Sequence, residues 1–270
     1  MTAAVDAIGT RQFPVLFVQL CAHLVDADSA HLSAFFEDAA PVEIVSTRDD
    51  HEAAKLLSLY LEVGFVLDPF YQLFVKERYD RVDRLADIAP DDFKRSEYYS
   101  RFFKPLALKE ECGLMIAFDG GAALFLSVGA HSPRKLRLDG LRSLLPVLSS
   151  LAHRHWRVLT PERSDGTGRL AAQLEAAFMS FGNSKLSPKE SQVARMILQG
   201  HSSKSMARVL DNSPETIKVH RKRLYAKLDI SSQTELLSLF LGALRMMPAG
   251  ASGDPLIYMP DAAHIPRQGD

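Results

Sequence analysis

The residues best suited to chemistry in this sequence are cations that recur along one short segment, residues 213–228. Ser213-Pro214-Glu215-Thr216 offers a hydroxyl N-cap and a proline at the first helical position, so it predicts the start of a helix. Three aliphatic residues of that helix share one sector of its helical wheel and are expected to face a core: Ile217, Leu224 and Leu228. The cations must therefore point outward.

The outward side of this helix has the chemistry that reads bases in a major groove. It presents Lys218, Val219, Lys222 and Ala226, with Arg221 and Arg223 on the flanks. Lysine donates to guanine O6 and N7, valine meets a thymine methyl, and a small alanine permits close approach. For a charge run alone, a solvated basic face is the better interpretation.

The order of the preceding elements favours DNA. Ser187-Pro188-Lys189-Glu190 predicts a helix with reciprocal Ser and Glu caps, and Gln199-Gly200-His201 predicts its end. A shorter helix after Ser202, burying Met206, Ala207 and Leu210, is expected before the turn at Asp211-Asn212. The cationic helix is then the second helix of a helix-turn-helix, whose N-terminal end contacts base edges.

Residues 186–236 resemble the C-terminal DNA-binding domain of the LuxR/FixJ family. The positions that match the family pattern are Leu186, Pro188, Glu190, Val193, Gly200, Lys204, Ala207, Leu210, Ser213, Thr216, Val219, His220, Lys227, Leu228 and Glu235. The departures are Ser203, Met206 and Gln233, where asparagine, isoleucine and arginine are common.

The resemblance implies a four-helix domain in which Lys218, Val219 and Lys222 approach the bases. The residues expected at phosphates, which position the protein rather than specify a sequence, are Lys204, Thr216, Arg221, Arg223 and Lys227. His220 is expected to be hydrogen-bonded within the domain or to contact a phosphate.

Ser232 and Glu235 predict a further capping box, which opens a fourth helix with Leu236, Leu237, Phe240 and Leu244. The resemblance implies that this helix contributes to a homodimer, and core packing is the alternative. A dimer would present two recognition helices to half-sites about 34–36 Å apart, which favours an inverted repeat in double-stranded DNA.

Charge is divided unevenly along the 270 residues. The net charge is −1, yet residues 184–245 carry 11 Lys and Arg against 5 Asp and Glu. With 47% hydrophobic and 24% charged residues, the composition is that of a globular protein. Cys21 and Cys112 lack metal or disulfide spacing, and no secretory or transmembrane segment is evident, so a cytoplasmic protein is expected.

The first part of the chain predicts an α+β sensor-like domain, similar to PAS or GAF domains in element order. The expected helices are 11–25, 50–65 and 137–156, and the expected strands are 31–36, 41–46, 112–118 and 122–128. Asp119-Gly120-Gly121 closes the last two strands into a hairpin.

Composition changes suggest four regions. They are a regulatory domain at 1–159, a linker and connecting helix at 160–183, the DNA-binding domain at 184–246, and a tail at 247–270 that is mobile or lies over another surface. The connecting helix is expected over 169–181.

The signal that the first domain receives is not identified by its residues. A phosphorylated receiver does not fit, because a helix comes first and Asp49 and Asp50 are better read as helix caps. Val66-Leu67-Asp68-Pro69 is similar to a ligand-contacting segment of acyl-homoserine lactone receptors, but Lys55 stands where those receptors carry a tryptophan. Asp68 is first an N-cap before Pro69, and Asp68 and Tyr71 are the ligand-binding candidates.

The sequence as a whole therefore predicts a one-component regulator of transcription that responds to a small molecule or a partner. No catalytic residue, metal or cofactor is expected, because no nucleophile, metal or phosphate-loop spacing is found. Aromatic residues crowd between Tyr60 and Phe103, where ordinary core is favoured over a pocket lining. The alternatives are an acyl-homoserine lactone receptor and a protein-interaction or enzymatic domain tethered to DNA.

Overall fold

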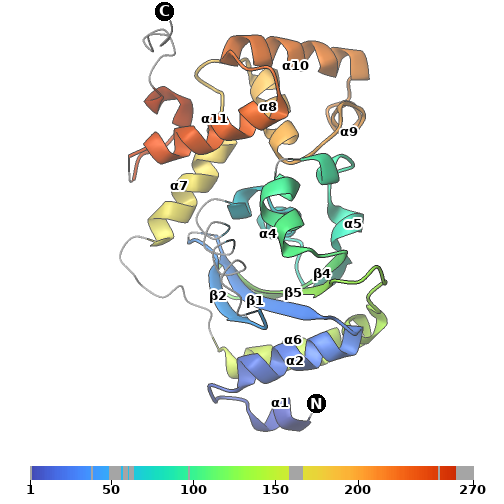
Figure 1. The fold of residues 1–270 in the computed structure, drawn as a ribbon. Helices are drawn as coiled ribbons and strands as arrows, with labels where there is room; N and C mark the ends of the chain where they lie inside the picture. Colours follow the sequence, from blue (N-terminus) through green and yellow to red (C-terminus); the bar gives the residue numbers. More distant parts are fainter. Residues whose placement is uncertain are drawn as a thin grey trace, which may run out of the picture.

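The structure is a computed structural model that describes residues 2–37, 39–48, 56, 60, 64–96, 98–157, 167–248 and 250–259, without the side chains of 167–172. Five antiparallel strands form one sheet in the order β2-β1-β5-β4-β3 (Figure 1). Their bounds are β1 Ser29–Phe36, β2 Val42–Ser46, β3 Arg81–Arg84, β4 Glu110–Phe118 and β5 Ala122–Ala130. Gly120 and Gly121, with φ of 80° and 71°, close the predicted β4–β5 hairpin.

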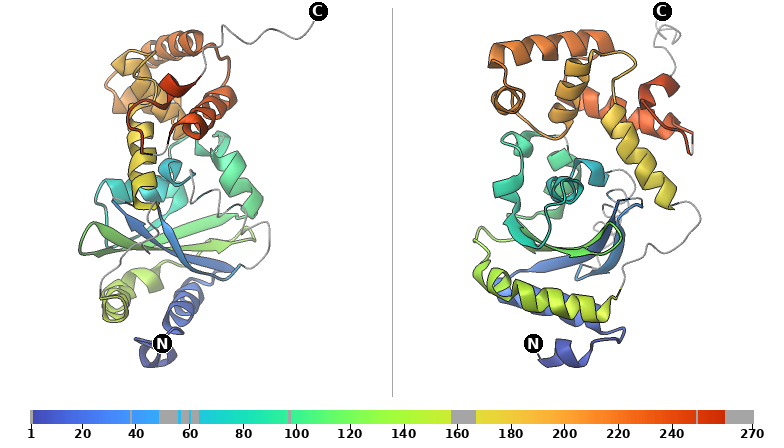
Figure 2. Two further views of the ribbon diagram at one scale, coloured as in Figure 1. Left: turned by 90° about the vertical axis from the view of Figure 1, so that its left-hand side faces the viewer. Right: turned by 180° about the vertical axis from the view of Figure 1, so that it is seen from behind.

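One face of the sheet is covered by helices α2, Phe13–Val25, and α6, Asp139–His155, with the short α1, Thr2–Asp6, beyond them (Figure 2). Alternate strand residues such as Leu32, Leu114 and Leu126 are buried on this side. Leu141, Leu148 and Leu151 of α6, the helix expected over 137–156, pack onto them.

The other face is covered by short elements between β2 and β4. They are η2 Phe65–Leu67, α4 Pro69–Val75, α5 Leu85–Ile88, η3 Phe93–Arg95, the π-helical turn η4 Tyr99–Phe103 and η5 Lys104–Leu106. Aromatic rings occupy part of the space between them and the sheet. Gly113 makes room for this layer, because a Cβ there would lie 2.4 Å from the Phe70 ring and 2.7 Å from the Phe125 ring.

The C-terminal part consists of helices α7 Thr167–Ser180, α8 Pro188–Leu198, α9 Ser203–Val209, α10 Pro214–Leu228 and α11 Gln233–Met246. The predicted serine caps before α8 and α10 are present, and α8 has the full reciprocal capping box. Ser202, after which a helix was expected, also caps α9. At α11 only half of the predicted box forms. Ser232 accepts from the Glu235 N–H, but the Glu235 carboxylate accepts from the N–H of Ser231, one residue earlier than expected.

The end of the chain returns to the start of this helical part. Residues 250–259 include η6, Pro255–Tyr258, which packs against α11 with Leu256 buried. The Asp254 carboxylate accepts from the N–H groups of Gly182 and Ser184. This part of the tail thus lies over another surface, the second of the two expectations.

Some expectations fall outside the described residues. They include most of the helix predicted over 50–65, the caps at Asp49 and Asp50, Lys55, most of the linker, and the last residues of the tail. Cys21 and Cys112 are buried and free. Among the described helices, none is long and apolar enough to cross a membrane.

An ion pair between buried Glu190 and exposed Lys227 joins α8 to α10 and gives a testable stability effect. Glu190 is 3% exposed and accepts from Lys227 Nζ at 2.6 Å and from the Ser187 N–H at 2.8 Å. Burial opposes its charge, but the bonds from Lys227 and Ser187 prevail and lower its pKa from 4.5 to about 2. Since the folded pKa is depressed, the carboxylate stabilises the fold above pH 4.5, and this contribution is lost as the pH falls towards 2.

We therefore expect Glu190→Gln to lower the free energy of unfolding by about 1–3 kcal/mol near neutral pH, measured by urea denaturation. The difference from wild type should shrink below about pH 3. Glu215→Gln, on the exposed start of α10, is the control and should stay within about 0.5 kcal/mol of wild type. A deficit that persists unchanged in acid would show that the carboxylate charge is not responsible.

Candidate DNA-reading surface and ligand cavity

Helix α10 is the outermost element at the end of the molecule opposite the sheet (Figure 1). Ile217 and Leu224 are fully buried and Leu228 is 8% exposed, which confirms the predicted inward sector. On the opposite side Lys218 and Lys222 are exposed, and Val219 is 47% exposed. Glu215 lies 3.9 Å from Lys218, but both side chains are solvated and such a pair contributes little.

The five residues expected at phosphates differ in their surroundings. Lys204 and Arg223 are exposed. Arg221 donates to Ser203 Oγ at 3.3 Å and lies 5.9 Å from the Tyr225 ring centre, so its guanidinium is held along α10. Thr216 is tied to the Ser213 cap, and Lys227 is paired with Glu190. All five lie on α9 or α10, around the exposed side of α10.

His220 was expected to be hydrogen-bonded within the domain or to contact a phosphate. Its Nδ1 atom is buried and has no hydrogen-bond partner among the described residues, so the predicted bond within the domain is not found at that atom.

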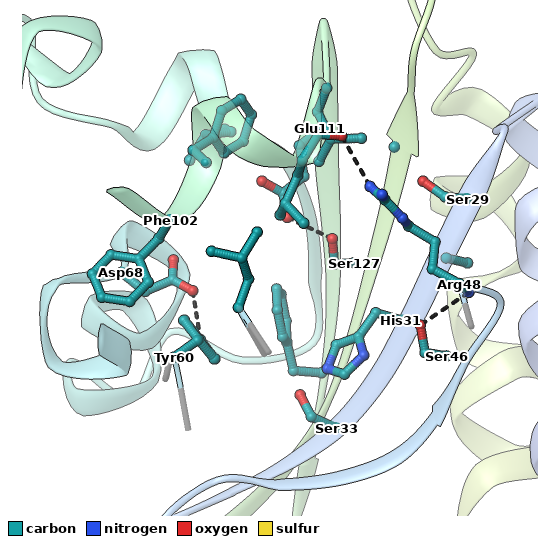
Figure 3. Close-up of a pocket in the computed structure, with 18 of the residues that line it drawn as sticks. Ser29, His31, Ser33, Ser46, Arg48, Tyr60, Asp68, Phe102, Glu111 and Ser127 are labelled. Carbon is teal, nitrogen blue, oxygen red and sulfur yellow. Dashed lines mark hydrogen bonds between the residues drawn. The ribbon is translucent and has the colours of Figure 1, made fainter. Parts of the chain in front are cut away.

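A second candidate site is a cavity of about 190 Å³ between the sheet and the described residues Leu56, Tyr60 and those from Asp68 to Leu108 that line it (Figure 3). Its floor is set by strand register. His31 on β1 stands beside Ser46 of β2 and Ser127 of β5, and Gly129 of β5 stands between Ser29 and Glu111. Since side chains alternate between the faces of a strand, these polar groups share the side away from α2 and α6.

Asp68 lies in the cavity wall. It caps α4 by accepting from the Phe70 N–H at 2.8 Å, which confirms the predicted N-cap, and it accepts from the Tyr60 hydroxyl at 2.6 Å (Figure 3). Burial raises its pKa to about 6, opposed by the bond from Tyr60.

Tyr71, the other ligand candidate, is not among the residues that line this cavity. It is 1% exposed and packs against the rings of Phe35, Phe65 and Phe74. Its hydroxyl is hydrogen-bonded to Glu175 of α7, so it joins the sheet layer to the connecting helix.

Glu111, which was not predicted, lies across the cavity from Asp68 (Figure 3). Burial, together with the charge of Asp68, raises its pKa to about 8, while the Ser127 hydroxyl donates to it. The Arg48 side chain points toward Glu111 and donates to the carbonyl oxygen of Leu106 at 2.9 Å. The signal that sequence reasoning missed is a polar residue at every second position of an otherwise apolar strand, as at Ser29, His31 and Ser33.

The aromatic segment 93–103 has two roles. Phe93, Tyr98 and Phe102 are buried core residues, as expected, and together with Phe103 they also line the cavity. Phe65, Phe70, Tyr71 and Phe74 do form buried core.

The two residues before this segment, Asp91 and Asp92, contact the turn of the helix-turn-helix. The Asp91 carboxylate accepts from the N–H of Ser202 at 3.0 Å and from its hydroxyl, and the Asp92 N–H donates to the Gly200 carbonyl at 3.1 Å. Gly200 has a φ of +89°, and a Cβ there would lie 3.0 Å from Phe93 Cα. The cavity wall and the turn between α8 and α9 are therefore in direct contact.

Known proteins are similar to this chain both in the helix-turn-helix and in the N-terminal part. The family model of bacterial regulatory proteins of the luxR family matches residues 184–240. The N-terminal part is similar in fold to the VqsR LBD domain of Pseudomonas aeruginosa, with a TM-score of 0.50 and 24% identity over 59% of this chain and 95% of that one. This likeness supports the predicted α+β sensor-like fold.

Two curated relatives show how far the sequence similarity extends. The transcriptional regulatory protein RcsB of Escherichia coli is 32% identical over 33% of this chain and 39% of its own length. The "Putative HTH-type transcriptional regulator in exeN 3'region" of Aeromonas salmonicida is 31% identical over 192 residues, which cover 68% of this chain and 97% of that protein. By this relationship, and by the family match over the helix-turn-helix, the chain belongs to the LuxR family of bacterial transcriptional regulators.

Proposed function

We propose that this chain is a one-component regulator in which a small molecule bound in the cavity controls binding of the α10 surface to DNA. The observation that carries the proposal is the shared segment 91–103. It forms a wall of the cavity with Phe93, Tyr98 and Phe102, and it holds the turn between α8 and α9 through Asp91. A ligand that binds one arrangement of this segment more tightly than another shifts the protein towards that arrangement.

The DNA-binding half of the proposal assigns separate roles to two groups of residues. Lys218, Val219 and Lys222 contact base edges in the major groove. The residues that contact phosphates are Lys204, Thr216, Arg221, Arg223 and Lys227. A homodimer on an inverted repeat fits the two half-sites that such domains address. A protein of this kind acts on DNA in the cytoplasm and needs no catalytic group of its own.

An acyl-homoserine lactone receptor is the second candidate function. The observation in its favour is Asp68, whose carboxylate lies in the wall of a cavity lined by aromatic rings. Tyr71, the other ligand candidate, would then act from the core behind that wall through its contact with Phe65.

The assignment of base and phosphate contacts is tested by two lysine variants of the full chain, on a site found by mapping bound genomic DNA. Lys222→Ala is expected to weaken binding to that site by about 1–3 kcal/mol and binding to random DNA much less. Lys204→Ala should weaken both by similar factors and reduce the slope of log affinity against log salt by about 1. Electrophoretic or fluorescence titrations at several salt concentrations measure both quantities.

The two lysines control for each other, because both are exposed and both lose one charge. Equal losses of sequence preference in the two variants would contradict the assignment. An affinity that does not change with salt would contradict phosphate binding altogether.

The coupling segment is tested by hydrogen exchange at the helix-turn-helix turn. Asp91→Ala removes the acceptor of the Ser202 N–H, so exchange at Ser202 should accelerate by about tenfold or more. Asp92→Ala is a matched control, since its side chain reaches only the exposed Arg95 at 3.8 Å and its backbone bond to Gly200 remains. If both variants exchange like wild type, the contact does not hold the turn in solution and this route of control is wrong.

A further inference from the structure

Two polar atoms in the floor of the cavity lack hydrogen-bond partners among the described residues. Ser33 is 1% exposed and its Oγ has no partner, and His31 Nε2 is likewise buried without one. Both residues line the cavity, and they stand two positions apart on the same side of β1 (Figure 3). Buried polar atoms are normally paired, so two neighbouring exceptions at a cavity indicate where a ligand atom belongs.

The charged groups of the described residues around the cavity are in a different situation, because each has a hydrogen-bond partner or is exposed to solvent. Asp68 is satisfied by the Tyr60 hydroxyl and the Phe70 N–H, and Glu111 accepts from Ser127. Arg48 donates to Leu106, and Glu43 is exposed at the rim. A charged ligand group would have to compete with these bonds to reach a counter-charge, and burying a charged group is costly.

The two unpartnered groups are themselves neutral at physiological pH. Burial lowers the pKa of His31 to about 4, so its imidazole is uncharged there. A neutral imidazole nitrogen and a serine hydroxyl pair well with a hydroxyl or carbonyl group. The opposite wall supplies rings and aliphatic side chains, among them Phe93, Phe102 and Leu108.

Resting on the proposed ligand cavity, we infer that its ligand is an uncharged molecule with an apolar body. A hydroxyl or carbonyl group of that molecule pairs with Ser33 and His31 on β1, and not with Asp68. The sheet thus binds the polar end of the ligand, while the body of the ligand contacts segment 91–103, which reaches the helix-turn-helix.

The test uses three probes with the same body and different ends: 4-phenyl-1-butanol, 4-phenylbutylamine and 4-phenylbutanoate. Binding to the full chain at neutral pH is measured by calorimetry and by the shift of the thermal midpoint. The alcohol should bind about tenfold or more tightly than either charged probe, because it alone brings no unpaired charge. A preference for the amine or the carboxylate would overturn the inference.

Ser33→Ala tests the residue assignment with two readouts. It should raise the thermal midpoint of the unliganded protein, since it removes an unpaired buried hydroxyl, and it should weaken alcohol binding about three- to tenfold. Ser191→Ala is the matched control. The Ser191 Oγ is also buried without a partner among the described residues, but it lies on α8 away from the cavity, so its loss should raise the midpoint and leave alcohol binding unchanged.

The remaining outcomes separate this inference from the proposed function. If Asp68→Asn removes the advantage of the alcohol while Ser33→Ala does not, the polar end lies at Asp68 and the inference is wrong, although the cavity still binds ligands. If none of the probes binds, the ligand cavity itself fails. A lower midpoint for unliganded Ser33→Ala would show that its hydroxyl is paired in solution, which also overturns the inference.

Discussion

The rest of the structure depends on one constraint, the burial of the two faces of a five-stranded sheet against different layers. One face is closed by α2 and α6 with aliphatic and aromatic side chains that form a packed core. The other face meets a layer of short elements that do not fill it, and the polar side chains of β1, β4 and β5 point into the space that is left. Because alternate residues of a strand point to opposite faces, each of these strands is core on one side and cavity floor on the other.

The DNA-binding part is joined to this second layer by close contact at its turn. Gly200 has a left-handed φ and lies against the backbone of Phe93, so a side chain at this position would both strain the turn and separate the two parts. Buried apolar residues run without interruption from the cavity side of the sheet to α8 and α11. A change in the packing of segment 91–103 would therefore displace the turn between α8 and α9, since densely packed interiors transmit displacement.

Local signals in the sequence predicted most of the helices and the helix-turn-helix. Serine and proline at a helix start and aliphatic residues at helical spacing act within a few residues and were readable at α8 and α10, and a glycine after the helix end was readable at α8. The β4–β5 hairpin was predicted for the same reason, because its loop lies between its strands. The reciprocal bond of Glu235 was misplaced by one residue, since its carboxylate accepts from the Ser231 N–H, while Ser232 reaches the same carboxylate with its hydroxyl.

The cavity could not be predicted from the sequence, because it forms where strands far apart in the chain pair, and no local signal encodes that pairing. His31 and Ser127 become neighbours only because β1 inserts between β2 and β5, and Glu111 joins them through the register of β4 on β5. Asp68 was identified as a cap, but its place in the wall follows from how α4 packs on the sheet. The aromatic residues were ambiguous for a related reason: a ring that lines a cavity and a ring that fills a core have the same sequence signature.

The position of α10 restricts how a ligand in that cavity can act. Helix α10 lies at the far end of the molecule from the sheet (Figure 2), and its Lys218, Val219 and Lys222 are exposed, so the N-terminal part does not cover them. Control by uncovering this surface is therefore excluded for this arrangement of the chain. Segment 91–103 contacts the turn between α8 and α9, so what it can alter is the orientation of the whole helix-turn-helix. Orientation matters little to one domain on one half-site, but it decides whether two copies meet half-sites separated by one helical turn. A modest displacement at Gly200 and Ser202 would thus affect paired binding far more than single binding, which is the behaviour required of a regulator whose DNA surface is always open.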